Sequence, residues 1–272
     1  MEIISVLGCG WLGLPLAGYL IEKGYQVKGS TRTPGELKVI ESCGIKPFYL
    51  VLGPHLRGDG IDDFFNCDVI VINFPPERRE DIVEYHQAQI GSLIARIKLS
   101  PITKVLFVSS TSVYPEINRD VFEDERALPE KASGEALLAV ERKLTDCAEF
   151  KTTVIRFGGL IGYDRMPGRF LAGKTGISGG EAPVNLIHRD DCIRIIYKII
   201  ELDTWGEILN ACADEHPLRK EYYVAQAEKL GLEPPKFNET GRAGYKIVRN
   251  DRLKRLLGYE FKYPDPSSID EG

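Results

Sequence analysis

The chain has 272 residues, which is enough for one large α/β domain or for a large domain with a small partner. Hydrophobic residues make up 43% and charged residues 28%, so the composition excludes the disordered and fibrous classes. The net charge is -5 and no basic block occurs, which argues against nucleic acid as a partner.

The sequence predicts no contact with a membrane, because no apolar stretch reaches ~18 residues. The first residues run directly into an apolar segment without a signal-peptide pattern, so we expect a cytoplasmic protein. The six cysteines and four histidines are widely scattered. We therefore expect no metal site, and the thiols are predicted to be reduced.

The first predicted strand, residues 3–7, ends at a glycine-rich turn, residues 8–13, that reads G-C-G-W-L-G. A helical pattern follows, and then a second strand-like run at residues 25–28. This G-x-G-x-x-G spacing after a strand is the dinucleotide fingerprint, in which the three glycines allow a tight turn, close approach of a pyrophosphate and close helix packing. The phosphates would lie on the N-terminus of the helix. The alternative is an ordinary glycine-rich turn without a cofactor.

Short apolar runs alternate with helical patterns through the first half, which predicts an α/β fold with a doubly wound parallel sheet, the Rossmann fold. Further strands are predicted at residues 45–50, 68–73, 104–108 and 152–157, and helices at 78–98 and 131–148. The run at 68–73 is continuously apolar, as expected for a strand buried on both faces. Hydroxyl-bearing residues at 109–114 follow a strand, so they should lie at the same edge of the sheet as the glycine turn.

The composition changes after residue 157, because eight glycines fall within residues 158–180 and predict a long loop. Residues 184–188, a helix at 190–202 and a strand at 207–211 are predicted to return to the sheet. Helices near 218–230 and 251–257 and a strand near 245–248 would form a small C-terminal α+β cap. We therefore assign residues 1–157, with 184–211, to a dinucleotide-binding domain, and residues 158–183 and 212–272 to a substrate or cap domain.

Five segments in order resemble the extended short-chain dehydrogenase/reductase superfamily, and most of all its atypical branch that is similar to nucleoside-diphosphate-sugar epimerases. They are residues 109–114 (S-S-T-S-V-Y), 154–162, 185–191 (N-L-I-H-R-D-D), 207–211 and 252–259. The resemblance implies an oxidoreductase or epimerase-like enzyme that acts on a small polar substrate, one candidate being a nucleotide-linked sugar. Homodimers are common in the family, so a homodimer is one state that the resemblance suggests.

The catalytic signature of that family, Tyr-x-x-x-Lys on the helix after the serine-bearing strand, is missing here. No tyrosine occurs in residues 115–150. One alignment is anchored on Glu135; it retains Lys131 but puts Ala127 at the position of the tyrosine.

A second alignment is anchored on Glu141 and puts Ser133 and Leu137 at the positions of the pair. We prefer it, because residues 134–141 read most like the atypical branch. In either alignment the group that moves the proton is left unassigned.

The predicted catalytic residues are Ser110 and Tyr114. Ser110 falls at the family's catalytic hydroxyl position, although such a hydroxyl can also cap local backbone. Tyr114 is the nearest phenol in sequence, and packing under the cap is the favoured interpretation for it. His188 is interpreted as structural because it has no visible partner, and Arg165 and Arg169 are either contacts for an anionic substrate or solvated loop residues.

The cofactor type is argued from the end of the second strand. NAD enzymes usually place an acid about twenty residues past the motif, whereas NADP enzymes use small residues and an arginine. No acid lies between Glu22 and Glu36, while Ser30 and Arg32 fit the NADP pattern, so we expect NADP rather than NAD. Arg32 could also be a solvated loop residue. The predicted cofactor-binding residues are Gly8, Gly10, Trp11, Leu12, Gly13, Ser30, Thr31, Arg32, Asn73 and Pro75.

Two functions stay open at this point. The first is hydride transfer to or from NADP(H), with Ser110 polarising the reacting oxygen of a small-molecule substrate. The second is a protein of the same fold that senses NADP(H) without turning over a substrate, which the loss of Tyr-x-x-x-Lys would explain.

Overall fold

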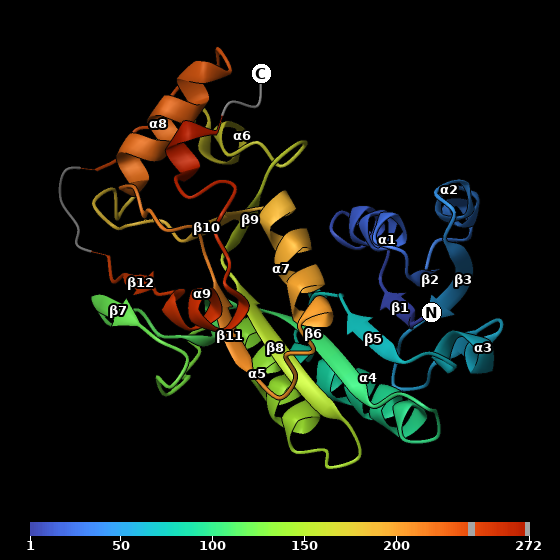
Figure 1. Cartoon of the computed structure of the whole chain (residues 1–272). Coiled ribbons are helices and arrows are strands. Elements are labelled where there is room, and N and C mark those ends of the chain that lie inside the picture. Colours follow the sequence, from blue (N-terminus) through green and yellow to red (C-terminus); the bar gives the residue numbers. More distant parts are fainter. Residues whose placement is uncertain (239–242, 270–272) are drawn as a thin grey trace. The chain divides into compact units, whose positions relative to one another are not determined.

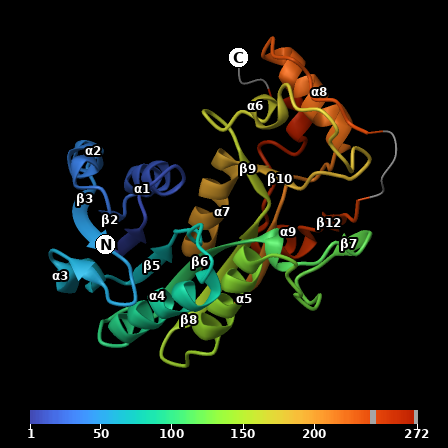
Figure 2. The ribbon, with the colours of Figure 1, turned by 180° about the vertical axis from the view of Figure 1, so that it is seen from behind.

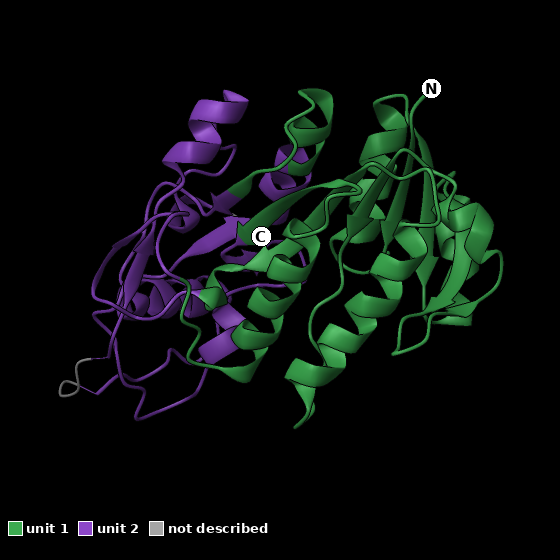
Figure 3. Ribbon diagram, turned by 90° about the horizontal axis from the view of Figure 1, so that it is seen from below, with its two compact units in different colours: residues 1–113, 127–156, 196–208 green, residues 114–126, 157–195, 209–272 purple. Residues whose placement is uncertain are grey.

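The computed structural model describes residues 1–238 and 243–269, and the chain divides into two compact units (Figure 3). Unit 1 comprises Met1–Val113, Ala127–Arg156 and Ile196–Ile208, and unit 2 comprises Tyr114–Arg126, Phe157–Ile195 and Leu209–Gly272. The two units differ from the predicted domains. Residues 114–126, 184–195 and 209–211, which were assigned to the dinucleotide-binding domain, belong to unit 2.

The large sheet has eight strands in the order β11-β8-β6-β5-β1-β2-β3-β4 (Figure 1). They are β1 (Ile3–Leu7), β2 (Gln26–Thr31), β3 (Lys46–Val51), β4 (Arg57–Gly58), β5 (Val69–Ile72), β6 (Lys104–Ser110), β8 (Lys151–Phe157) and β11 (Ile208–Ala211). The pairs around β1 are parallel, and the two-residue edge strand β4 is antiparallel to β3. The predicted doubly wound α/β sheet is therefore confirmed.

The centre of this sheet is apolar on both faces. Every residue of β5 is buried, and so are Ile4, Val6 and Leu7 of β1. Such strands need cover on both sides, since exposing a Val or Ile side chain loses about 1.5–3 kcal/mol of burial free energy. The continuous apolar runs thus account for the helices that flank the sheet.

The helices of unit 1 are α1 (Gly13–Glu22), α2 (Leu37–Ser42), α3 (Ile61–Phe65), α4 (Ile82–Ile97) and α5 (Ala132–Thr145), with short 3₁₀ turns η1 (Pro34–Glu36) and η2 (Thr111–Val113). Helices α4 and α5 lie side by side (Figure 2). On α4 the residues Ile82, Ile90, Leu93 and Ile97 are buried, which is the spacing of one helical face. The short helices α2 and α3 were not predicted.

Unit 2 contains two small parallel sheets. One pairs β9 (Gly159–Ile161) with β10 (Leu186–His188), and the other pairs β7 (Arg119–Val121) with β12 (Lys246–Val248). The prediction that residues 184–188 return to the large sheet is corrected, because β10 pairs with β9 instead. The other elements are α6 (Gly168–Leu171), α8 (Arg219–Lys229), α9 (Asp251–Leu257) and η3 (Pro266–Ser268), while α7 (Arg189–Glu201) begins in unit 2 and ends in unit 1.

All six cysteines are free thiols. In the described residues, no group of three or more His, Cys, Asp or Glu side chains is arranged to hold a metal ion. No helix in the same part of the chain is both long and apolar enough to cross a membrane.

Candidate functional site

The turn after β1 can be built only with glycine at two positions. Gly8 has a φ of +102°, and a Cβ atom there would lie 2.3 Å from the carbonyl oxygen of Asn73. A Cβ atom on Gly13 would lie 2.0 Å from the carbonyl oxygen of Gly8. The side chain of Asn73 donates a hydrogen bond from Nδ2 to that same carbonyl at 3.1 Å. The turn is therefore closed tightly onto the first turn of α1 and onto the end of β5.

Gly10 differs from these two glycines. It is exposed, and no atom lies within 4 Å of the position that its Cβ would occupy. No contact within the protein therefore requires a glycine at this position. The empty space lies at the start of the ten-residue helix α1, where the amide of Leu14 donates to the carbonyl of Gly10 at 3.0 Å and no side chain caps the helix. A phosphate group fits this cradle, because it would lie at the positive end of the helix dipole.

The turn also lies where the order of the sheet reverses. Strand β1 is flanked by β5 on one side and by β2 on the other, and ligands of open α/β sheets bind at the carboxyl ends of the strands at this switch point. The registers align Leu7 with Ile72, and Ile72 with Phe107. Ser110, three residues beyond Phe107, therefore lies at the same edge of the sheet as the glycine turn.

The glycine-rich turn is held by a hydrogen bond to the end of β2 and by buried side chains of its own. Ser30 is buried, and its Oγ accepts a hydrogen bond from the amide of Gly8 at 3.2 Å. Cys9 is buried as well, and burial raises the pKa of its thiol to about 12, so the thiol stays protonated and serves packing. Leu12 is buried, and Trp11 is half-buried.

The end of β2 carries an acid that the sequence argument missed. Thr31 is buried and donates from Oγ1 to Glu36 Oε2 at 2.5 Å. The 3₁₀ turn η1 brings the Glu36 carboxylate back to the end of β2, which the spacing in the sequence does not reveal. Arg32 is exposed and forms an ion pair with Glu77 at 2.9 Å. A cation and a carboxylate are thus both present at the end of β2, the position on which the expectation of NADP rests.

Ser110 has the geometry of a donor. It is half-buried, and its Oγ accepts a hydrogen bond from the amide of Ser112 at 3.1 Å. Because that amide occupies an acceptor site, the hydroxyl proton can be donated to a bound oxygen. Its catalytic role stays a prediction.

Next to Ser110 lies a buried charged group that sequence analysis did not identify as part of the site. Ser109 donates from Oγ to Glu141 Oε1 at 2.5 Å, and Arg156 donates from Nη2 to Glu141 Oε2 at 2.6 Å. The side chains of Arg156 and Glu141 are only 4% and 3% exposed. The available signal was Glu141 itself, a carboxylate that fell on the buried face of a predicted helix.

The first two turns of α5 hold neither a phenol nor an ammonium group at the preferred positions of the family pair. Ser133 is exposed and Leu137 is buried. Between them, a Cβ atom on Gly134 would lie 2.5 Å from the carbonyl oxygen of Ser112. The helix therefore packs directly against η2, the turn that follows Ser110.

Tyr114 lies in unit 2 and is buried, with 1% of its surface exposed. Its hydroxyl donates to Asn210 Oδ1 at 2.9 Å, and its carbonyl accepts from Lys246 Nζ at 3.0 Å. These contacts give Tyr114 a role in packing, as the favoured sequence interpretation had it. A catalytic role for this phenol stays a prediction.

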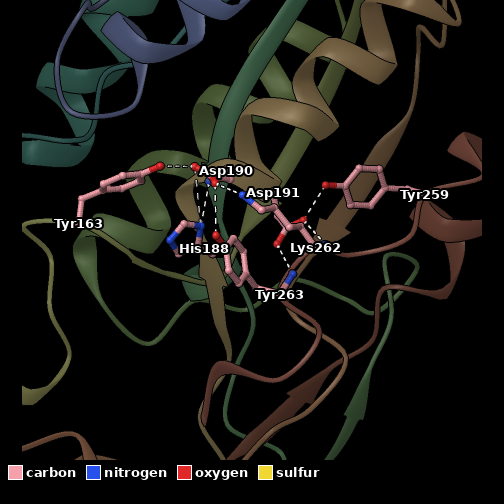
Figure 4. Close-up of polar contacts among 7 residues, drawn as sticks. All are labelled: Tyr163, His188, Asp190, Asp191, Tyr259, Lys262 and Tyr263. Carbon is pink, nitrogen blue, oxygen red and sulfur yellow. Dashed lines mark hydrogen bonds and ion pairs between the residues drawn. The ribbon is translucent and has the colours of Figure 1, made fainter. Parts of the chain in front are cut away.

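His188 closes the N-terminus of α7. Its Nδ1 accepts a hydrogen bond from the amide of Asp190 at 3.1 Å, and its ring lies 4.0 Å from that of Tyr263 between centroids (Figure 4). The side chain is buried, so these contacts agree with the structural interpretation. Arg165 and Arg169 are both exposed.

Asp191 fastens the C-terminal segment to the start of α7. It is fully buried and accepts hydrogen bonds from the Tyr259 hydroxyl at 2.6 Å and from the amides of Lys262 and Tyr263 at 2.8 and 3.1 Å. A buried carboxylate with three donors is well compensated. Asp191, the last residue of the segment 185–191 that resembles the family, therefore anchors the C-terminal segment.

Asp190 joins the same helix start to the loop after β9. It accepts from the Tyr163 hydroxyl and from Lys262 Nζ, each at 2.8 Å (Figure 4). Burial alone would raise the pKa of Asp190, but these two hydrogen bonds outweigh it and hold that pKa below its usual value. Tyr163 has a positive φ of 58°, and the guanidinium of Arg189 lies 3.7 Å from its ring centroid. Both of these hydrogen bonds to the Asp190 side chain thus come from within unit 2.

Comparison with other proteins places the chain in a family. Protein YeeZ of Escherichia coli strain K12 is 36% identical over 269 residues, which cover 98% of each chain. No model of a protein family matches the chain.

The solved structures that resemble it share its fold. A short-chain dehydrogenase/reductase superfamily protein from Agrobacterium tumefaciens, crystallised with bound NAD, superposes with a TM-score of 0.78 at 18% identity, over 96% of this chain and 93% of the other. UDP-glucuronic acid 4-epimerase from Bacillus cereus, in complex with UDP-glucuronic acid and NAD, gives a TM-score of 0.78 at 19% identity, over 96% and 94%. The chain therefore belongs to the family of Escherichia coli protein YeeZ and has the fold of the short-chain dehydrogenase/reductase superfamily.

Proposed function

We propose that the protein binds NADP(H) at the carboxyl edge of the large sheet and is an oxidoreductase or epimerase-like enzyme for a small polar substrate. The observation that carries the proposal is the open space at Gly10, at the start of α1 and beside the switch point of the sheet. Gly8, Gly13, Ser30 and Asn73 would keep the turn in shape, and the positive N-terminal end of α1 would attract the pyrophosphate.

The nicotinamide, when bound, supplies or accepts a hydride. Ser110 would donate its hydroxyl proton in a hydrogen bond to the reacting oxygen of the substrate, while the amide of Ser112 fixes its orientation. The Bacillus cereus epimerase with the same fold was crystallised with UDP-glucuronic acid, which supports a nucleotide-linked sugar as the substrate class to test first.

Arg32 would bind the 2′-phosphate that distinguishes NADP from NAD. Its present partner is a partly exposed carboxylate, and ion pairs near the surface contribute only about 0–1 kcal/mol, so Arg32 can exchange partners at little cost. A charge-assisted contact to phosphate contributes about 1.5–3 kcal/mol. We therefore expect Arg32→Ala to weaken NADPH binding roughly tenfold to hundredfold and to leave NADH almost unchanged.

Fluorescence titration of the two reduced dinucleotides measures this difference. Glu36→Gln is the matched test of the alternative, since a carboxylate at the end of β2 favours the 2′-hydroxyl of NAD. Tighter binding of NADH than NADPH by the unmodified protein, lost in Glu36→Gln, would reverse the assignment of the cofactor.

A second candidate function is sensing of NADP(H) without turnover. The observation that favours it is the pair of residues Ser133 and Leu137, since an exposed serine and a buried leucine replace the phenol and ammonium. A positioned acid or base contributes about 10²–10⁴ in rate. Oxidation of NADPH by no member of a broad panel of sugar ketones, aldehydes and nucleotide-linked sugars would support the sensor.

Tyr114→Phe separates a packing role from a catalytic one. The substitution keeps the ring and removes the hydroxyl that donates to Asn210, so we expect the free energy of unfolding to fall by about 1–3 kcal/mol. Urea unfolding measures that loss, and NADPH titration should give the wild-type affinity. A rate lowered by ~10² or more at full cofactor occupancy would instead identify Tyr114 as the proton donor.

A further inference from the structure

One ion pair joins the two strand ends on either side of the glycine turn. Arg32 follows β2 directly, and Glu77 lies in the segment that follows β5. Strand β1, which carries the turn, lies between β2 and β5 in the sheet. The bond between Arg32 Nη1 and Glu77 Oε1, at 2.9 Å, therefore spans the edge at which the phosphate cradle opens.

The Arg32–Glu77 ion pair contributes little to the stability of the fold, so Arg32 can exchange Glu77 for another anion. The side chain of Arg32 is 74% exposed and that of Glu77 is 38% exposed, so water screens the attraction strongly. Opening an exposed pair shifts an equilibrium by at most about fivefold. A phosphate dianion attracts a guanidinium more strongly, because it offers more negative charge and a bidentate set of oxygens.

We propose that Glu77 is a selectivity-determining residue that competes with the 2′-phosphate of the cofactor for Arg32. This inference rests on the proposed function. When a dinucleotide without the 2′-phosphate binds, the ion pair stays closed. When NADPH binds, Arg32 leaves Glu77 for the 2′-phosphate. The Glu77 carboxylate then has no cation beside it and repels the nearby phosphate, which is also negatively charged. Glu77 thus weakens NADPH binding selectively and keeps the preference for NADP moderate.

The test is a titration of NADPH and NADH into the wild type and into Glu77→Gln. Adenosine 2′,5′-bisphosphate and adenosine 5′-monophosphate, the two adenosine halves, serve as probes that are independent of the nicotinamide and of turnover. We expect Glu77→Gln to bind NADPH and the bisphosphate about fivefold more tightly. Affinity for NADH and for the monophosphate should change by less than about twofold.

Glu80→Gln is the matched control. Glu80 is an exposed acid in the same segment, so this variant makes the same change of charge without touching Arg32. It should leave all four affinities near those of the wild type. The gain from Glu77→Gln should also shrink in the Arg32→Ala background, because no guanidinium is then released.

An equal gain for NADPH and NADH, an equal gain from Glu80→Gln, or no gain at all would overturn the role of Glu77. These outcomes would not contradict the proposed function, because each affinity would be measured in a protein that still binds a dinucleotide. A wild type that binds none of the four probes would overturn both.

Discussion

Replacing Glu141 with glutamine should lower the free energy of unfolding by about 3–5 kcal/mol, one of the two largest effects that we expect. The Glu141 carboxylate takes hydrogen bonds from Ser109 and from the guanidinium of Arg156, and both charged side chains are almost fully buried. An amide in its place leaves the Arg156 charge uncompensated in a medium of low dielectric constant.

Glu149→Gln is the matched control for that substitution. Glu149 pairs with Lys98, but its side chain is 51% exposed and water screens the pair, so the same chemical change should have little effect on stability. Urea unfolding followed by circular dichroism compares the two variants. Equal small losses would mean that the Glu141–Arg156 pair does not hold β6, α5 and β8 together.

Gly10→Val should lower the affinity for NADPH by roughly hundredfold or more, which is ~2.7 kcal/mol. A valine there puts a branched side chain into the space that the pyrophosphate needs. The fold should survive, since nothing in the structure lies within 4 Å of the new Cβ. Thermal melting should therefore differ from the wild type by only a few degrees, as about 1 kcal/mol would produce.

Gly18→Val controls for the substitution itself. Gly18 lies in α1, the helix that follows the turn, and it also has nothing within 4 Å of its Cβ position. It should bind NADPH like the wild type. Equal affinities of Gly10→Val and Gly18→Val would show that the phosphate does not lie at Gly10.

The large sheet was predictable because its strands are continuous apolar runs that can be recognised in the local sequence. Residues 69–72 are apolar without interruption, and the glycine turn follows β1 directly. Strands near β10 and β12 were predicted, but the pairing within the small sheets of unit 2 was not predictable in the same way. Strands β7, β9, β10 and β12 have three residues each, too few for a periodic pattern, and β7 pairs with a strand more than a hundred residues away. Local sequence therefore could not distinguish β10 from a strand of the large sheet.

The residues of the candidate site were predictable where they lie close together in the sequence. The glycines, Ser30 and Ser110 belong to continuous segments, so the sequence indicated them directly. Glu36 and Glu77 were missed, because each reaches the end of β2 through a fold in the chain that no spacing rule encodes. The buried partners of Glu141 were hidden for the same reason, since Arg156 lies on a different element.

Titration of the unmodified protein with NADPH and NADH, followed by the fluorescence of the nicotinamide, tests the central claim most directly. The account predicts saturable binding of NADPH, one per chain, with a dissociation constant roughly in the micromolar range and weaker binding of NADH. Absence of binding of either dinucleotide at about millimolar concentration would contradict it, because the Gly8–Gly13 turn would then be a structural turn without a cofactor.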